Sequence, residues 1–455
     1  MARMKRILGM NLGNHLEKGN MRLQLLMRAL RSRNYRLFFA GQSISLVGTW
    51  MQQVAMSWLV YRLTGSAFLL GLVGFASQIP TFLLAPVAGV LADRWDKRLL
   101  LIITQTLSML QAAALAFFVL AGTVQVWQIV TLGLILGIIN TFDIPARQSF
   151  IVEMVDNRED LGNAIALNSS MFNAARLIGP SIAGLLVAAV GEGVCFILNA
   201  LSYLTVIVAL VAMRLDPGKP KRARRHILHE LREGVSYAFG FSPIRSILLL
   251  IALVSLMGMP YSILMPVFAR DILHGGPHTF GFLMAASGCG ALASTVYLAS
   301  RKSVLGLGKL IASASAIFGS GLIAFAFSSS LLLSLLFLCL TGFGAMALVA
   351  SSNTILQTIV DDDKRGRVMS LFTMAFIGIA PFGSLIAGAL ANVIGARNTL
   401  LIGGASCLAG GVFFARNLPD IRNKIRPIYV KMGIISEVAT GMQSAAEPTI
   451  PPEEQ

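Results

Sequence analysis

The chain alternates twelve apolar segments with short polar connections. Each segment holds about 20 mainly apolar residues, the length that an α-helix needs to cross a bilayer. Backbone groups in lipid must be hydrogen-bonded internally, and the segments lack the two-residue alternation of a barrel, so helices are predicted. We therefore predict an all-α integral membrane protein with twelve transmembrane helices, at residues 37–61, 68–91, 99–121, 126–147, 162–188, 194–213, 246–269, 279–300, 309–327, 330–358, 367–391 and 396–415.

Lysine and arginine are distributed unequally between the two sides of this predicted topology. An even number of spans places both termini on one side, and that side receives 33 of the 37 basic residues. The opposite side has only Arg62, Arg270 and Arg397. Because basic loops stay in the cytoplasm, we expect a multi-pass protein of the bacterial inner (cytoplasmic) membrane with both termini cytoplasmic.

The composition agrees with a membrane protein and favours membrane lipid over nucleic acid as a partner. The chain is 55% hydrophobic and only 13% charged, and its mean hydropathy is +0.73. The net charge of +16 lies in short gaps between apolar segments, which is typical of contact with anionic membrane lipid and not with nucleic acid. All four cysteines fall within apolar segments, so no disulfide framework is predicted. We expect no cofactor and no metal site.

A shift of 204 residues superimposes small-residue patterns in the fifth and eleventh segments. The superimposed pairs are Gly179 with Gly383, Ile182 with Ile386, Ala183 with Ala387, Gly184 with Gly388 and Gly191 with Gly395. Together with the segment count, this predicts two pseudo-symmetric six-helix halves, an architecture of alternating-access transporters. The predicted organisation is a basic arm at 1–36, an N-terminal half at 37–213, a cytoplasmic linker at 214–245, a C-terminal half at 246–416 and a disordered cytoplasmic tail at 417–455.

The connection between the second and third segments carries the motif GVLADRWDKR. Its acid, Asp93, can face the positive N-terminus of a neighbouring helix and latch one conformation. The motif resembles the signature loop of the major facilitator superfamily, and it departs from the family pattern at Asp96, where a glycine is usual. The alternative is a charge cluster that only sets topology. The matching gating-loop residues are Gly89, Asp93, Arg94, Lys97 and Arg98.

The fifth segment contains ARLIGPSIAG, which is similar to the glycine-proline motif of antiporters in that superfamily. Its small residues recur every fourth position and form a stripe on which a second helix can pack closely. Such stripes occur in many membrane helices, so a purely structural role is the alternative. The motif residues are Ala175, Gly179, Pro180, Ala183 and Gly184.

The resemblance extends over nearly all of residues 34–416, including NTFDIPARQSF in the fourth segment and MPVFARDILHGGP after the seventh. It points to the branch that contains the enterobactin exporter and transmembrane secretion effectors, close to bacterial macrolide efflux proteins. This implies a major facilitator fold and proton-driven export by alternating access, with a small amphipathic molecule such as a drug or siderophore as substrate. Which molecule is carried stays open.

Three other functions compete with export. An uptake carrier or a lysolipid flippase would share the fold, and a non-transporting receptor or scaffold is a third possibility. An enzyme is not expected, because the chain has no HExxH motif, no Walker loop and no histidine-acid cluster in or beside its segments. We expect a monomer whose partners are a small molecule, protons and membrane lipid.

Ionisable residues within lipid are costly and are functional candidates for that reason. Asp143 is the one carboxylate well inside a predicted segment, and Arg147 follows it one turn later on the same helical face. We interpret Asp143, together with Arg147 or Arg176 of the next segment, as the proton-coupling group. The alternative is a structural ion pair with Arg147 or with the signature loop.

Polar and aromatic side chains in apolar segments are candidates for lining a substrate path. Each of them can instead be a hydrogen bond that holds two helices together. The candidates are Gln42, Gln52, Gln53, Trp58, Gln78, Tyr261, Asn353 and Gln357.

Overall fold

The computed structural model describes residues 27–214, 235–301 and 303–435, which form helices and short connections without β-strands. Eleven of these helices, or runs of helices, are long and apolar enough to cross a membrane. The twelfth predicted span is α2 (Arg33–Thr64), which is 32 residues long but more polar because it carries arginines at both ends and three glutamines. The chain is therefore an all-α integral membrane protein with the predicted two sets of six spans.

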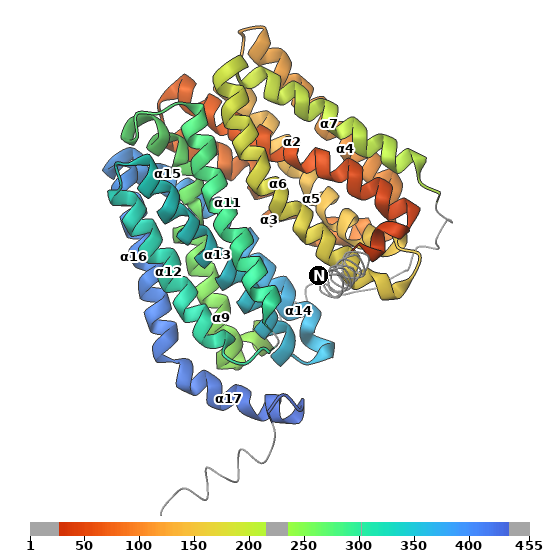
Figure 1. Cartoon of the computed structure of the whole chain (residues 1–455), viewed down its shortest axis with the longest axis vertical. Helices are drawn as coiled ribbons and strands as arrows, with labels where there is room; N and C mark the ends of the chain where they lie inside the picture. Colours follow the sequence, from red (N-terminus) through yellow and green to blue (C-terminus); the bar gives the residue numbers. More distant parts are fainter. Residues whose placement is uncertain (1–26, 215–234, 302, 436–455) are drawn as a thin grey trace, which may run out of the picture.

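The first six spans form one group of helices, coloured red to yellow in Figure 1. Within this group α2 packs against α6 and α7, α3 against α5, and α4 against both α5 and α7. The predicted fourth span ends too early, since α5 continues to Met154 and not to residue 147. After α2, the bounds are α3 (Ala67–Arg94), α4 (Lys97–Leu120), α5 (Val126–Met154), α6 (Leu161–Val190) and α7 (Glu192–Ala212).

The last six spans form the second group, green to blue in Figure 1, where α11 lies beside α6 of the first group. Within it α13 packs against α11 and α12, and α12 against α16. The regular helices are α9 (Ser242–Leu253), α10 (Met265–Val267), α11 (Pro277–Ser300), α12 (Leu307–Phe327), α13 (Leu331–Ile359), α14 (Asp362–Thr373), α15 (Ala380–Ile394) and α16 (Ala396–Arg416).

Two spans of the second group are interrupted helices. The seventh passes from α9 through the π-helical turn η3 (Val254–Gly258), the 3₁₀ turn η4 (Met259–Leu264) and α10 to the π-helical turn η5 (Phe268–Ile272). The eleventh has a π-helical turn, η6 (Met374–Gly378), between α14 and α15. Pro260, Pro266 and Pro381 stand at these breaks, and proline removes a backbone donor and disturbs the regular helical ladder.

The segment after the last span differs from the prediction. No ordered element was expected after Asn417, but Leu418–Lys431 form helix α17. Leu418, Ile421 and Ile425 recur at helical spacing and are buried against the second group, so an apolar face stabilises the helix. The prediction of disorder is therefore wrong for this stretch, while the basic arm to residue 26, linker residues 215–234 and the tail from 436 lie outside the described residues.

The two groups approach most closely at two pairs of glycines. The Cα of Gly281 on α11 is 2.9 Å from where a Cβ of Gly184 on α6 would stand, and the Cα of Gly388 on α15 is equally near a Cβ on Gly71 of α3. The 204-residue shift relates Gly184 to Gly388, so the two contacts are pseudo-symmetric. Both lie toward the side opposite the described chain ends, which we call the far side; the other is the terminal side.

Candidate functional site

Asp143 lies in the interior of the first group and is only 4% exposed. Its Oδ1 accepts hydrogen bonds from Thr104 Oγ1 (2.9 Å) and Gln105 Nε2 (2.8 Å) of α4. Its Oδ2 is 3.6 Å from Nη2 of Arg147, one turn along α5. Because α5 ends at Met154, Asp143 stands about 16 Å from the terminal-side end of its helix. The carboxylate is thus deeper in the span than the sequence indicated.

Arg176 does not join this cluster. Its guanidinium carbon lies 5.9 Å from the centroid of the Trp50 ring on α2, and it has no carboxylate partner among the described residues. One face of α6 meets α2 at Gly179, and another meets α11 at Gly184. Because successive helical residues are rotated by about 100°, Arg176 lies between these two faces. The predicted pairing of Asp143 with Arg176 is therefore wrong, and the pairing with Arg147 is the one present.

A second buried polar cluster joins α2, α4 and α7. Gln52 Nε2 donates to Gln111 Oε1 (2.9 Å), and Asn199 Nδ2 donates to Gln52 Oε1 (2.7 Å). Tyr203 of α7 is buried next to this cluster, and its hydroxyl interacts with Asn199 and Ser108. Sequence reasoning missed Asn199, Gln111, Thr104 and Gln105; their signal is an amide or hydroxyl within an apolar segment.

The substrate-path candidates separate into buried and accessible side chains. Gln42, Gln52, Trp58 and Tyr261 are buried; Gln52 belongs to the amide cluster, and Tyr261 is hydrogen-bonded to Ser287 at 2.5 Å. The amide oxygen of Gln42 is buried without a hydrogen-bond partner among the described residues. The others are at least partly accessible: Gln53 is exposed, Gln78 donates to Gly74 of its own helix, and Gln357 donates to Asn353.

The glycine-proline motif of α6 contacts two neighbouring helices, α2 and α11. A Cβ on Gly179 would lie 2.5 Å from the Trp50 Cβ on α2, whereas Gly184 faces α11. Ala175 and Ala183 are buried on the same helix, and α6 continues past Pro180 without interruption. The motif therefore brings α6 close both to its own group and to the other one.

The signature loop forms a short turn between α3 and α4. Asp96, the departure from the family pattern, is the N-cap of α4, and its carboxylate accepts from the Leu99 backbone N–H at 2.8 Å, which is a common way to begin a helix. Lys97 forms an ion pair with Glu153 of α5, and Arg98 donates to the Val211 carbonyl of α7 at 2.8 Å. Gly89, Asp93 and Arg94 lie in the last two turns of α3, and the side chains of Asp93 and Arg94 are outside the description.

Polar contacts also join the two groups at the far side. The Tyr61 hydroxyl at the end of α2 donates to Asp271 Oδ2 on η5, and the Arg270 guanidinium lies 5.8 Å from the Tyr61 ring centroid. One turn deeper, the rings of Trp58 and Phe280 stack at 6.3 Å. These contacts and the two glycine pairs hold the two groups together at the far side.

Solved structures share this fold. The POT family transporter PepTSo superposes with a TM-score of 0.66 at 14% identity, covering 86% of this chain and 98% of that one. A bacterial homologue of the iron transporter ferroportin, in an inward-facing state, gives 0.65 at 18% identity, covering 84% and 98%. With its two groups of six spans, the chain has the same fold as these two transporters.

Sequence comparison identifies the family to which the chain belongs. Residues 27–428 match the family described as transmembrane secretion effector, and the chain belongs to this family. It is therefore a secondary transporter of the major facilitator type and not an enzyme. It is 27% identical to the staphyloferrin A transporter of Staphylococcus aureus, over 82% of this chain and 93% of that protein. It is 26% identical to the multidrug efflux pump Tap of Mycolicibacterium fortuitum (84% and 93%) and 21% identical to macrolide efflux protein A of Streptococcus pyogenes (82% and 93%).

Proposed function

We propose that the chain is a proton-coupled exporter of a small amphipathic molecule, such as a drug or a siderophore, working by alternating access. Support for export comes from the relatives, of which two are named efflux proteins. Support for proton coupling is a single observation in the structure, the buried Asp143 carboxylate with its loosely held arginine.

The geometry around Asp143 gives a proton a place to bind. Oδ1 is already occupied by two neutral donors, while Oδ2 has only the Arg147 guanidinium at 3.6 Å, too long for a hydrogen bond. A proton on Oδ2 would cancel the charge that holds Arg147. The Arg147 side chain is 20% exposed, so its guanidinium can then turn toward water and change the contacts of α5.

The first experiment identifies a substrate. Cells whose own efflux pumps are deleted are tested for export of dyes, macrolides and catecholate siderophores, with and without the chain. Purified protein in vesicles is then tested for substrate exchange without a gradient and for accumulation driven by a pH gradient. A lack of both activities across the panel would favour a non-transporting role.

Proton coupling is tested with Asp143→Asn. We expect this variant to fold and to exchange substrate, but to lose accumulation driven by a pH gradient, because an amide cannot load and release a proton. Asp160→Asn is the matched control: it removes another buried carboxylate, paired with Arg28 at 2.5 Å, and should lower stability without uncoupling. Gradient-driven accumulation by Asp143→Asn would place coupling elsewhere, and a variant that cannot be recovered folded would establish a structural ion pair.

We further propose that the terminal side faces the cytoplasm of a bacterial inner membrane, as the distribution of basic residues indicates. Cysteines introduced at Gly65 and Pro277 should react with an impermeant reagent added outside intact cells. Cysteines at Lys221 and Lys364 should not. Strong labelling at Lys221 from outside would invert the proposed orientation.

A further inference from the structure

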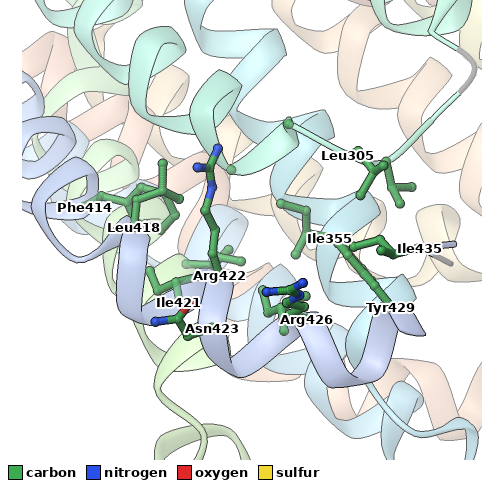
Figure 2. A pocket seen from close by; sticks show the side chains of 15 residues that line it. Leu305, Ile355, Phe414, Leu418, Ile421, Arg422, Asn423, Arg426, Tyr429 and Ile435 are labelled. Carbon is green, nitrogen blue, oxygen red and sulfur yellow. The ribbon is translucent and has the colours of Figure 1, made fainter. Parts of the chain in front are cut away.

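A pocket of about 340 Å³ lies between α17 and the terminal-side ends of the second group of helices. Its walls come from α9, the connection before α12, α13, the end of α16 and α17 itself. Figure 2 shows Leu305 and Ile355 on one side of the space and α17 along the other. The floor is apolar, formed by residues such as Ile247, Ile355 and Phe414.

Helix α17 presents a different chemistry on each of its faces. Leu418, Ile421, Ile425 and Tyr429 are buried against the bundle. On the solvent face Lys424 Nζ lies 2.9 Å from Asp420 Oδ2, and this hydrogen bond lowers the pKa of the Asp420 carboxyl. Between these faces, Arg422 and Arg426 stand one turn apart and extend toward the pocket (Figure 2).

Within the part of the chain that the structure describes, the two pocket arginines have no counter-ion. Asp420, the acid on α17, pairs with Lys424, and neither Arg422 nor Arg426 forms an ion pair or a hydrogen bond within the described residues. Two guanidinium groups over an apolar floor match a ligand that has an anionic head and an apolar chain. Guanidinium binds phosphate oxygens in a bidentate manner.

The position of the pocket indicates where this ligand comes from. α16 ends at Arg416 and α12 begins at Leu307, so the pocket lies where spanning helices leave the membrane, at the level of lipid headgroups. In Figure 1, α17 runs crosswise beneath these ends. We propose that this pocket binds an anionic phospholipid, with its phosphate between Arg422 and Arg426 and its upper acyl chain on the apolar floor.

The main competitor is the chain's own tail. Residues 436–455 follow Ile435 at the edge of the pocket and contain Glu437, Glu447, Glu453 and Glu454. The apolar floor at membrane level favours lipid, because three of these four acids stand near the end of the tail, in a proline-rich sequence with few apolar residues.

The test uses the full chain in a neutral detergent. Phosphatidylglycerol, phosphatidylcholine, glycerol phosphate and inorganic phosphate are each titrated, while native mass spectrometry counts bound lipid and tryptophan fluorescence follows the unfolding temperature. The variants are R422Q/R426Q, R422K/R426K and a matched control, K424Q/K431Q, which removes two positive charges from the same helix outside the pocket.

We expect phosphatidylglycerol to bind and to raise the unfolding temperature of the wild type and of the control. R422Q/R426Q should bind it about thirtyfold more weakly, since each basic residue near an anionic lipid contributes about 1 kcal/mol. R422K/R426K should keep part of the binding. Phosphatidylcholine and the two soluble phosphates should have little effect.

Four results would overturn the proposal. One is equal phosphatidylglycerol binding by R422Q/R426Q and wild type, and a second is equal stabilisation by phosphatidylcholine. A third is stabilisation by inorganic phosphate as strong as that by phosphatidylglycerol, which would define a simple anion site. The fourth is phosphatidylglycerol binding that tightens more than tenfold in a chain ending at Ile435, which would make the tail the resident occupant. If R422Q/R426Q does not fold, the lipid comparison on the wild type and R422K/R426K still decides.

Discussion

The two groups of helices share a backbone arrangement but differ in the polar groups that they bury. Among the described residues, the buried amides and carboxylates all belong to the first group and its flanking turns, including Gln52, Gln111, Asp143 and Asn199. The buried polar residues of the second group are serines and threonines. The two groups are therefore related in backbone arrangement but not in the kinds of polar side chain that they bury.

This difference indicates a rigid group and a deformable one. Buried amides need partners on other helices, and losing such a partner is costly, which fixes α2, α4 and α7 relative to one another. A hydroxyl can bond to a carbonyl of its own helix, as Thr341 does with Phe337 at 2.8 Å. Some hydroxyls of the second group do bond across helices, as Ser315 does with the Cys407 carbonyl, but each is a single donor. With its π-helical turns, we therefore expect the second group to change its packing at a lower cost than the first.

The two glycine contacts between the groups should be equally important, unlike the buried polar clusters. Substitutions there should reduce transport more than any other change considered. We expect Gly184→Leu and Gly71→Leu each to reduce transport about a hundredfold, because a side chain at either position would overlap backbone of the opposite group. Gly162→Leu on α6, with open space around its Cα, is the control. Transport by vesicles, at matched protein content, is the measurement. A strong loss in only one of the two variants would refute an equivalent role for the two contacts.

The buried clusters should differ in stability. Asn199→Leu leaves Gln52 Oε1 without its donor and should lower the free energy of unfolding by about 2 kcal/mol. The matched residue in the second group is Ser315, also fully buried and bonded to the Cys407 carbonyl of another helix at 2.9 Å; Ser315→Ala should cost about 0.6 kcal/mol. Denaturant titration of the purified variants measures both. Equal costs would contradict the rigid and deformable distinction.

The two signature-loop regions should differ in transport. The N-terminal loop has Asp93 before its bases, whereas the equivalent region of the second half, at Arg301, has bases without the acid. We expect Asp93→Asn to insert normally and to lower transport about tenfold, by removing a charge that holds one gating state, while Arg301→Gln changes transport less than twofold. Initial rates at equal expression provide the comparison. Wild-type rates in Asp93→Asn would mean that the loop only sets topology.

Much of the fold could be predicted because apolar length is a local property of the chain. Even the more polar helix α2 could be predicted, since residues 37–61 are mainly apolar. The hydrogen-bond partners could not be predicted in the same way: Gln52 meets Gln111 and Asn199, which are 59 and 147 residues away. Arg176 was another candidate partner of Asp143. The rotation of α6 about its own axis decides which residues it faces, and the sequence does not reveal that rotation. Helix α17 was missed because the polar composition of the tail concealed the spacing of Leu418, Ile421 and Ile425.

The paired glycines have a consequence for the energy of switching. Where Gly184 meets Gly281 and Gly71 meets Gly388, the touching surfaces are backbone without interlocking side chains. At these two points the groups can part without moving a side chain. The side-chain contacts between the groups, such as Tyr61 with Asp271 and Phe82 with Phe382, must separate as well. A ligand must supply about 5.5 kcal/mol to invert a two-state population from 1:99 to 99:1, so a closure that one bound molecule can reverse must not be deeply stabilised. The two glycine contacts therefore bring the groups close together while adding little to the cost of separating them.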